Sequence, residues 1–502
     1  MSFKLYSRGL IFSYASIGTN IAYSLVSVPI ALSFLGKDGF GAWAVVLQIV
    51  LFLDFLDLGI SHGIARLLID VKGGASYGSA LATGSAAQAM IGTAVLLFGV
   101  ALAPFLPALV GVTGDLAFHF ATVTALVSAT AGLGTAARIY GGILYAHKRQ
   151  DLISLSHLGL FLVYLATMLA GFSLGWGLYS MAFSYACGTL WSVIFAIVCV
   201  QRRSLAPPRN SWGPLSKSLF REMFAFGHRA FLLGLGWTIL SGSPIFVISR
   251  TLGLDAAATW SVCLKPFQIL MQLLSKPTDV ATPFMAELYA QGEKNALRPK
   301  LQSLIQLTAA LAAAGCVAVA ALNPSFIALW TGGVISLPPL DHAALAGMVA
   351  VWALCRITST FVGVSKCFGW MPFIYFIEAA VFVVLSSLLI GPYGMIAIPI
   401  AAIACHLLIS FPFGIRLVRD EIGFTIPDFV SAISRPLIAA ALLGIVAFFV
   451  TKQPFFAAPM ADFLFKGSLL AIAGGCTILI ALTQSLRSQI FSLVLKGPSL
   501  VR

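Results

Sequence analysis

Residues 29–66 read PIALSFLGKDGFGAWAVVLQIVLFLDFLDLGISHGIAR, and this stretch decides the class of fold. It joins the end of one long apolar run, residues 10–35, to a second one, residues 41–68, through a short break at residues 36–40. Runs of about 20 or more apolar residues are long enough to cross a bilayer as helices. The pattern therefore predicts two successive membrane-spanning helices joined by a tight turn.

The same pattern runs through the rest of the chain and predicts an all-α, polytopic membrane protein. Hydrophobic residues make up 59% of the 502 residues and charged residues only 9%, against roughly 25% charged in a soluble domain, so a soluble fold is excluded. Apolar runs such as residues 437–450 do not alternate, which excludes a transmembrane barrel. About fourteen spans are expected, at residues 10–35, 41–68, 81–109, 116–138, 152–174, 178–200, 223–248, 256–285, 301–322, 343–367, 372–390, 395–418, 433–450 and 463–482.

The basic residues predict the orientation of these spans, because Lys and Arg in short loops favour the cytoplasmic side. With the N-terminus inside, most of the 30 Lys and Arg residues fall in cytoplasmic segments, whereas Lys37, Arg250, Lys452 and Lys466 fall outside. We therefore expect a multi-pass protein of the cytoplasmic (inner) membrane with both termini in the cytoplasm. The net charge of +13 is explained by this orientation, so no nucleic-acid partner is expected.

Two stretches of the chain look duplicated. Their common pattern is Pro29-Ile30, Leu35-Gly36 and Ala42-Trp43 in the first, and Pro244-Ile245, Leu252-Gly253 and Ala258-Thr259-Trp260 in the second. Parallel repeats of this kind are typical of transporters whose substrate path lies between two lobes. The pattern predicts two pseudo-symmetric six-helix lobes, residues 1–200 and 223–420, joined by a basic cytoplasmic linker, residues 201–222. Two further spans and a cytoplasmic tail follow in residues 421–502.

Short motifs near these repeats carry a family resemblance. They are Pro29-Ile30, Leu35-Gly36, Gly39 to Trp43, Leu56 to Ile60 with Arg66, Pro283 to Gly292, and Leu329 to Gly332. With them the chain resembles the polysaccharide flippases of the multidrug, oligosaccharidyl-lipid and polysaccharide export superfamily. The resemblance is most specific in residues 29–66.

The resemblance implies a fourteen-helix, two-lobed carrier that works by alternating access. Its expected substrate is a lipid-linked oligosaccharide, usually on undecaprenyl pyrophosphate, moved from the cytoplasmic to the outer leaflet for lipopolysaccharide or exopolysaccharide biosynthesis. The expected partners are this substrate, membrane lipids, H+ or Na+ as a coupling ion, and other polysaccharide assembly proteins.

Charged residues inside the spans are the candidate functional residues, because a charge at the bilayer centre costs at least about 2.5 kcal/mol. We predict that Lys265, Arg229 and Arg356 line a cationic cavity between the lobes and bind the diphosphate headgroup, for which Arg and Lys are suitable donors. The alternative for Lys265 is snorkelling to the outer surface, and for Arg229 to the cytoplasmic surface.

Five residues are predicted to act in gating or ion coupling: Asp54, Asp57, Arg66, Arg138 and Glu378. Asp57 is expected either to pair with Arg66 or Arg138 as a gate, or to cap the end of its helix. Two carboxylates three residues apart would also raise one pKa, which suits proton coupling. Arg356 and Glu378 lie at similar depth on neighbouring spans, so they are expected to pair. His119, His157 and His406 are isolated on apolar spans and are expected to be hydrogen-bonded core residues.

Two other functions stay open. A cation-coupled drug or small-molecule exporter of the same superfamily should carry an acidic residue in its first or seventh span, and residues 10–35 and 223–248 contain none. A membrane-embedded polysaccharide polymerase or ligase needs a substantial external loop, and the longest one, residues 323–342, offers only Asp341 and His342. No catalytic, metal or nucleotide motif stands out, so we expect a protein that is not an enzyme and uses no cofactor or metal.

Overall fold

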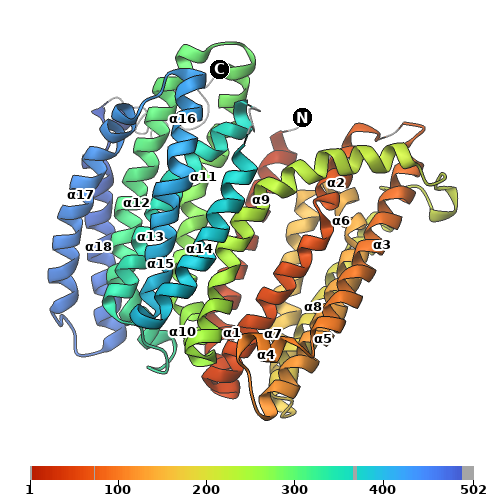
Figure 1. Ribbon diagram of the computed structural model, residues 1–502, viewed down its shortest axis with the longest axis horizontal. Coiled ribbons are helices and arrows are strands. Elements are labelled where there is room, and N and C mark those ends of the chain that lie inside the picture. The colour runs from red at the N-terminus through yellow and green to blue at the C-terminus, as the bar shows by residue number, and fades with distance from the viewer. Residues whose placement is uncertain (1–2, 73, 366–369, 485, 489–502) are drawn as a thin grey trace. The chain divides into compact units, whose positions relative to one another are not determined.

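The computed structural model describes residues 3–72, 74–365, 370–484 and 486–488. These residues form helices joined by short loops and contain no strand (Figure 1). The chain divides into two compact units, which we call unit 1 (Met1–Ala258) and unit 2 (Thr259–Arg502), with the boundary inside α10 (Leu254–Cys263). The all-α prediction is therefore confirmed. This division assigns α9 (Lys217–Leu252) to unit 1. It rests on packing and not on sequence duplication, so the boundaries of the two lobes stay a prediction.

The helices of unit 1 are α1 (Phe3–Leu53), α2 (Ile60–Asp70), α3 (Tyr77–Leu102), α4 (Leu106–Val110), α5 (Asp115–Ala136), α6 (Arg138–Ala146), α7 (Gln150–Ser173), α8 (Leu178–Arg202) and α9 (Lys217–Leu252). Helix α1 bends at Gly36, whose φ of 67° and ψ of −177° suit glycine alone. This bend is the turn predicted between the first two spans. A 3₁₀ turn, Asp54–Asp57, then leads into α2.

Helix α2 crosses α9 at a very short distance, and two glycines allow the approach. A Cβ atom at Gly59 would overlap the carbonyl group of Gly227, and one at Gly63 would overlap that of Met223. Leu58 and Gly59, at φ 47° and 79°, break the helix just before this crossing. The break leaves the acidic end of the 3₁₀ turn at the N-terminus of α2.

Unit 2 continues with α11 (Lys265–Ala290), α12 (Lys294–Trp330), α13 (Pro339–Ser365), α14 (Met371–Tyr393), α15 (Ala397–Cys405), α16 (Phe411–Ile422), α17 (Ile426–Lys452) and α18 (Pro459–Ala481). Helix α12 packs against α11, α13, α17 and α18. One π-helical turn, His406–Ser410, joins α15 to α16 and packs against α13 and α14.

Ten stretches of the described chain are long and apolar enough to cross a membrane. Two of them, Gly18–Asp57 and Met371–Ile422, have 40 and 52 residues and contain a helix break, so each is long enough for two crossings. Helices α9 and α11 lie at two further predicted spans. The chain is thus a multi-pass membrane protein, and the predicted count of about fourteen is consistent with these helices.

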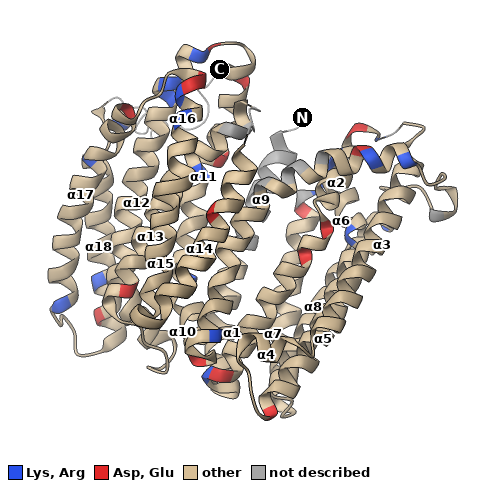
Figure 2. Cartoon of the chain, in the orientation of Figure 1, with Lys and Arg blue, Asp and Glu red and all other residues tan. Residues whose placement is uncertain are grey.

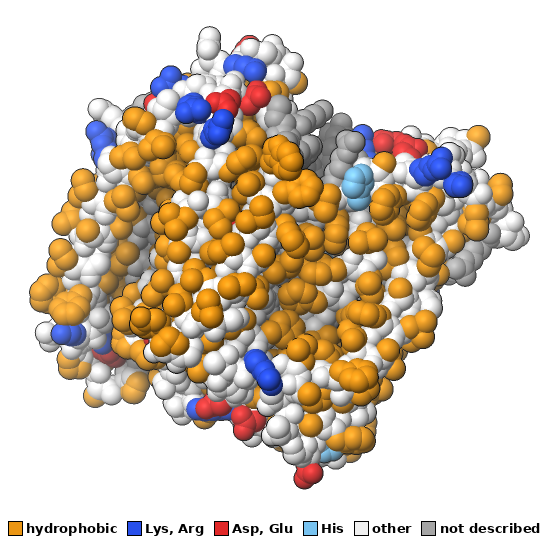
Figure 3. Space-filling model, viewed as in Figure 1, with side chains coloured by type: hydrophobic (Ala, Val, Ile, Leu, Met, Phe, Trp, Pro, Cys, Tyr) orange, Lys and Arg blue, Asp and Glu red, His pale blue; other side chains and the backbone are white. Residues whose placement is uncertain are grey.

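Side-chain chemistry along the helices agrees with this conclusion. In each unit the charged residues gather near the helix ends, and only a few lie midway along a helix (Figure 2). Hydrophobic side chains cover most of the surface between those ends in the space-filling view (Figure 3). The few charges away from the ends therefore identify where the candidate site should be sought.

Candidate functional site

An exposed acid–base pair lies in unit 1 where the 3₁₀ turn meets α6. Nη2 of Arg138 donates to Oδ1 of Asp54 at 2.7 Å, and both side chains are about two-fifths exposed. Arg66, which we expected to gate through Asp57, instead pairs with Asp70 one turn along α2, with Nε and Oδ2 3.1 Å apart. The predicted gate pairs of Asp57 with Arg66 or Arg138 are therefore wrong, because both arginines face other acids.

Asp57 caps a helix. Its buried carboxylate accepts hydrogen bonds from the backbone N–H of Ser61, at 3.2 and 3.3 Å, and from the Ser61 hydroxyl, at 2.8 Å. Nε2 of Gln88 donates to that hydroxyl at 2.8 Å. These are the contacts of an acid that neutralises the first turn of α2, where the helix dipole favours a negative charge. Asp57 thus caps a helix, as its alternative role predicted, but at the start of α2 and not at the end of the predicted span at residues 41–68.

Unit 2 contains a second exposed acid–base pair. Nη2 of Arg356 on α13 donates to Oδ1 of Asp279 on α11 at 2.8 Å, and both side chains are more than one-third exposed. The guanidinium also lies 5.8 Å from the ring centre of Trp352. The predicted pair of Arg356 with Glu378 is wrong, since similar depth does not ensure that two side chains face each other. Helix α11 packs against the face of α13 that carries Arg356.

Glu378 instead forms a buried cluster with two residues of the π-helical turn. Nδ1 of His406 lies 2.7 Å from Oε1 of Glu378, and the hydroxyl of Ser410 donates to the same oxygen at 3.1 Å. The side chains of Glu378 and His406 are 1% and 8% exposed. His406 is a hydrogen-bonded core residue as expected, but its acidic partner, 28 residues away in sequence, was missed.

Of the three residues predicted to bind the headgroup, the structure describes the side chains of two, Lys265 and Arg356. Lys265 is the first residue of α11 and lies next to Pro266. It is partly buried and makes no hydrogen bond or ion pair with any residue that the structure describes. Arg356 is held by Asp279. The side chain of Arg229, on α9, lies outside the described residues, so the three are not shown together.

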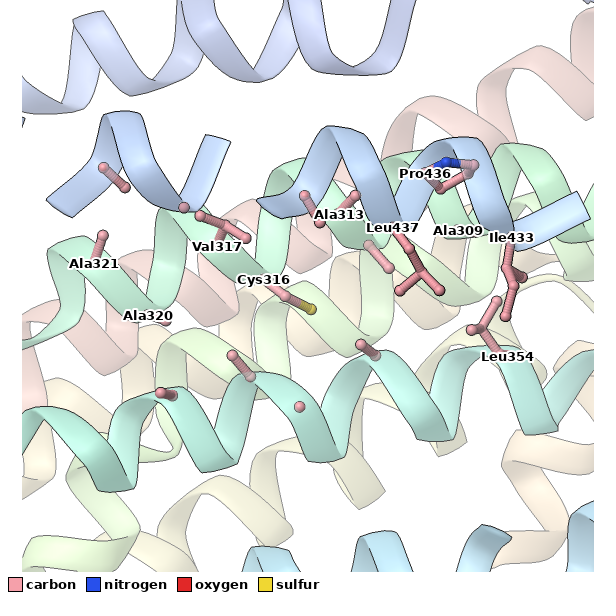
Figure 4. Close-up of a pocket in the computed structure, with 18 of the residues that line it drawn as sticks. Ala309, Ala313, Cys316, Val317, Ala320, Ala321, Leu354, Ile433, Pro436 and Leu437 are labelled. Atoms are coloured by element: carbon pink, nitrogen blue, oxygen red, sulfur yellow. The ribbon is translucent and has the colours of Figure 1, made fainter. Parts of the chain in front are cut away.

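An apolar cavity of about 480 Å³ lies in unit 2 among α12, α13 and α17 (Figure 4). Small residues such as Ala313, Gly347 and Ala440 line it, and its polar lining groups are those of Cys316 and Thr451. Small side chains on three neighbouring helices leave room that larger ones would fill. The cavity has the chemistry of a hydrocarbon site, and nothing in the sequence pattern predicted it.

No group of three or more His, Cys, Asp or Glu side chains that could hold a metal ion occurs in the described part of the chain. The groups described above are therefore three exposed acid–base pairs (Asp54–Arg138, Arg66–Asp70 and Asp279–Arg356), the capping carboxylate of Asp57, the buried Glu378–His406 pair and the Lys265 ammonium group. These groups can bind anions or exchange protons.

Comparisons with known proteins agree with this architecture. The family model described as polysaccharide biosynthesis protein matches residues 7–289. The solved structure titled lipid II flippase MurJ, in an inward closed conformation, is similar over 97% of this chain and all of its own, with a TM-score of 0.68 and 14% identity.

Two other solved structures share the fold. An inward-facing multidrug resistance MATE family transporter of the MOP superfamily matches over 80% of this chain and 95% of its own, with a TM-score of 0.62 and 14% identity. A MOP superfamily transporter from Pyrococcus furiosus, described as having a binding pocket of reverse polarity, matches over 83% and 96%, with a TM-score of 0.58 and 14% identity. No curated protein matches significantly.

Proposed function

Because this chain belongs to the polysaccharide biosynthesis protein family, we propose that it is a flippase that moves a lipid-linked oligosaccharide, carried on an undecaprenyl-type diphosphate, across the cytoplasmic membrane. The proposal includes alternating access, both termini in the cytoplasm and a role in surface polysaccharide biosynthesis. The MurJ-like fold supports it, since that structure is titled as a flippase of lipid II.

One observation carries the choice of substrate class: unit 2 combines an apolar cavity with cationic groups on membrane helices. The cavity among α12, α13 and α17 suits an isoprenoid chain, because its lining is almost entirely apolar and the chain needs no polar partner. Lys265 and Arg356 suit the diphosphate, because ammonium and guanidinium groups form strong, charge-assisted hydrogen bonds with phosphate oxygens. Arg229 is the proposed third cationic group.

The energetic reason for this arrangement is the charge of the headgroup. Moving a diphosphate through hydrocarbon is prohibitive, whereas a hydrated cationic surface replaces the lost water contacts. Arg356 would exchange its contact with Asp279 for the phosphate, and Lys265, which has no partner among the described residues, would gain one. A small cationic drug would be repelled by the same groups, which favours the flippase over the exporter.

The direct test uses proteoliposomes that contain undecaprenyl diphosphate linked to a fluorescent disaccharide. Flipping is measured as the fraction of probe that an impermeant reductant quenches over time. We expect Lys265→Gln to slow flipping about tenfold or more, since it removes a charge-assisted contact, and Lys265→Arg to retain more activity. Lys300→Gln, at an exposed position on α12, is the control. Normal flipping by Lys265→Gln would remove this residue from the site, and a wild-type protein without activity would contradict the function.

The cavity is tested in the same assay with a matched pair on α17. Ala440 lines the cavity, whereas its neighbour Ala441 is exposed and does not. We expect Ala440→Phe to reduce flipping and Ala441→Phe to leave it unchanged. Equal activity of the two variants would show that the lipid chain binds elsewhere.

A further inference from the structure

We propose that Glu378 and His406 form a proton-binding site that couples transport to a proton gradient, an inference that rests on the flippase function proposed above. The two side chains share one short contact, 2.7 Å between Oε1 and Nδ1, in a place that is almost completely removed from solvent. Such a pair is well suited to hold one exchangeable proton.

The number of protons on the pair decides its net charge. With one proton the pair is neutral overall, whether the proton lies on the carboxyl or on the imidazole. Without it, a carboxylate stays buried beside a neutral imidazole, and a buried charge without a countercharge is costly. Burial in the closed cluster therefore favours the protonated pair, and opening of the cluster to one side of the membrane favours release of the proton to water.

Within the part of the chain that the structure describes, no second countercharge faces the pair. From α13, α14 and α15 it is faced by the neutral groups of Cys355, Tyr375 and Cys405, each close enough to interact electrostatically with Glu378. Arg356 lies near Tyr375 but is bound to Asp279. On α16, Arg416, Arg419 and Asp420 are exposed, and Glu421 is bound to Tyr289 and Lys294. His406 is thus the cationic partner available to Glu378 among the described residues.

The same contacts favour a proton over a metal cation. A hard cation is held by several oxygen ligands, whereas the nearest partner of Oε1 is the imidazole nitrogen of His406. The hydroxyl of Ser410 is directed at the same oxygen. Filling the position with Na+ would require both contacts to break, and a proton requires neither to do so.

The π-helical turn supplies a way to open the site. Such turns are rare and occur often at functional sites, because they are less stable than α-helix. His406 is the first residue of the turn and Ser410 the last, so both partners of Glu378 lie within it. A change of the turn to α-helical hydrogen bonding would move both away from the carboxylate at once. Proton release and helix rearrangement would then be one event.

The first test needs no substrate. Infrared difference spectra of the purified full-length protein between acidic and alkaline buffers report protonation of carboxyl and imidazole groups. We expect a carboxyl signal in the wild type that Glu378→Gln removes and His406→Gln changes, while Asp420→Asn, at an exposed acid on α16, retains it. Glutamine keeps a hydrogen-bonding group at either position. Identical wild-type and Glu378→Gln spectra would overturn the proton site.

The second test connects the site to transport and uses the fluorescent diphosphate-linked probe. With one proton exchanged per cycle, a gradient of one pH unit should shift the transmembrane distribution of the probe by up to about tenfold in the wild type. The Glu378→Gln variant should still flip the probe, but the transmembrane distribution of the probe should not respond to the pH gradient. Wild-type flipping that follows a Na+ gradient and ignores pH would overturn the inference while supporting the flippase. An absence of flipping would contradict the flippase, and the infrared titration would still decide the proton site.

Discussion

Unit 1 and unit 2 carry similar exposed acid–base pairs but different buried acids. In each unit the exposed pair joins the second and the fourth predicted span of a repeat: Asp54 with Arg138, and Asp279 with Arg356. The buried acids differ in their partners, because Asp57 is bound by neutral groups of the next helical turn and Glu378 by an imidazole. The two exposed pairs thus lie at equivalent positions of the predicted repeats, whereas the Glu378–His406 cluster is found in unit 2. We infer that the two units have separate tasks.

The largest expected effect is that of removing the buried acid of unit 2. Glu378→Ala leaves His406 and Ser410 buried without their partner, so it should lower the free energy of unfolding by about 3 kcal/mol. Glu378→Gln should cost much less, since its amide can still bind both. Thermal unfolding of the purified protein in detergent measures the difference. Equal losses for the two variants would show that the hydrogen bonds to Glu378 do not stabilise the cluster.

A smaller effect is expected for the buried acid of unit 1. Asp57→Ala removes a helix cap and should cost about 1 kcal/mol, and Asp57→Asn or Asp57→Ser should restore most of it, since either side chain can cap. The flipping rate of these variants should fall only as far as the amount of folded protein falls. If Asp57→Asn instead abolished the response to a pH gradient at normal stability, unit 1 would hold a titrating site and the contrast between the units would fail.

The smallest effect is expected for the exposed pairs, where solvent screens the charges. Double-mutant cycles with Arg138→Ala and Asp54→Ala, and with Arg356→Ala and Asp279→Ala, should each give a coupling energy of about 0.5 kcal/mol in unfolding. When the same variants are compared by their flipping rates, the two cycles should differ, because Arg356 is proposed to bind the headgroup and Arg138 is not. Equal transport defects in the two cycles would remove this distinction.

Hydropathy was enough to predict the fold because the length of an apolar run is a one-dimensional property. The turn at Gly36 and the spans on both sides of it are examples. Depth along the membrane could be predicted in the same way, which is why Arg356 and Glu378 looked like partners. Pairing also depends on the rotation of each helix about its axis, and that is set by tertiary packing. The acid that pairs with Arg356 is therefore Asp279 and not Glu378, which the sequence predicted.

Local irregularities account for the rest of what sequence missed. The break at Leu58-Gly59 divides the span that sequence predicted as continuous, so Asp57 caps the start of α2, and the glycine after two aspartates was the available signal. The π-helical turn that brings His406 to Glu378 has no such signal in the sequence. The cavity is equally hidden, since alanines and glycines on α12, α13 and α17 read as ordinary membrane-helix residues until the helices are packed.

The proposed substrate is a diphosphate-linked lipid and not a small cationic molecule, and one preparation of proteoliposomes, divided in two, distinguishes them. One half receives undecaprenyl diphosphate linked to a fluorescent disaccharide, and the other receives ethidium. We expect protein-dependent flipping of the lipid that Lys265→Gln slows, and ethidium movement no faster than in protein-free vesicles. Protein-dependent transport of ethidium together with an unmoved lipid would contradict the proposal and identify an exporter.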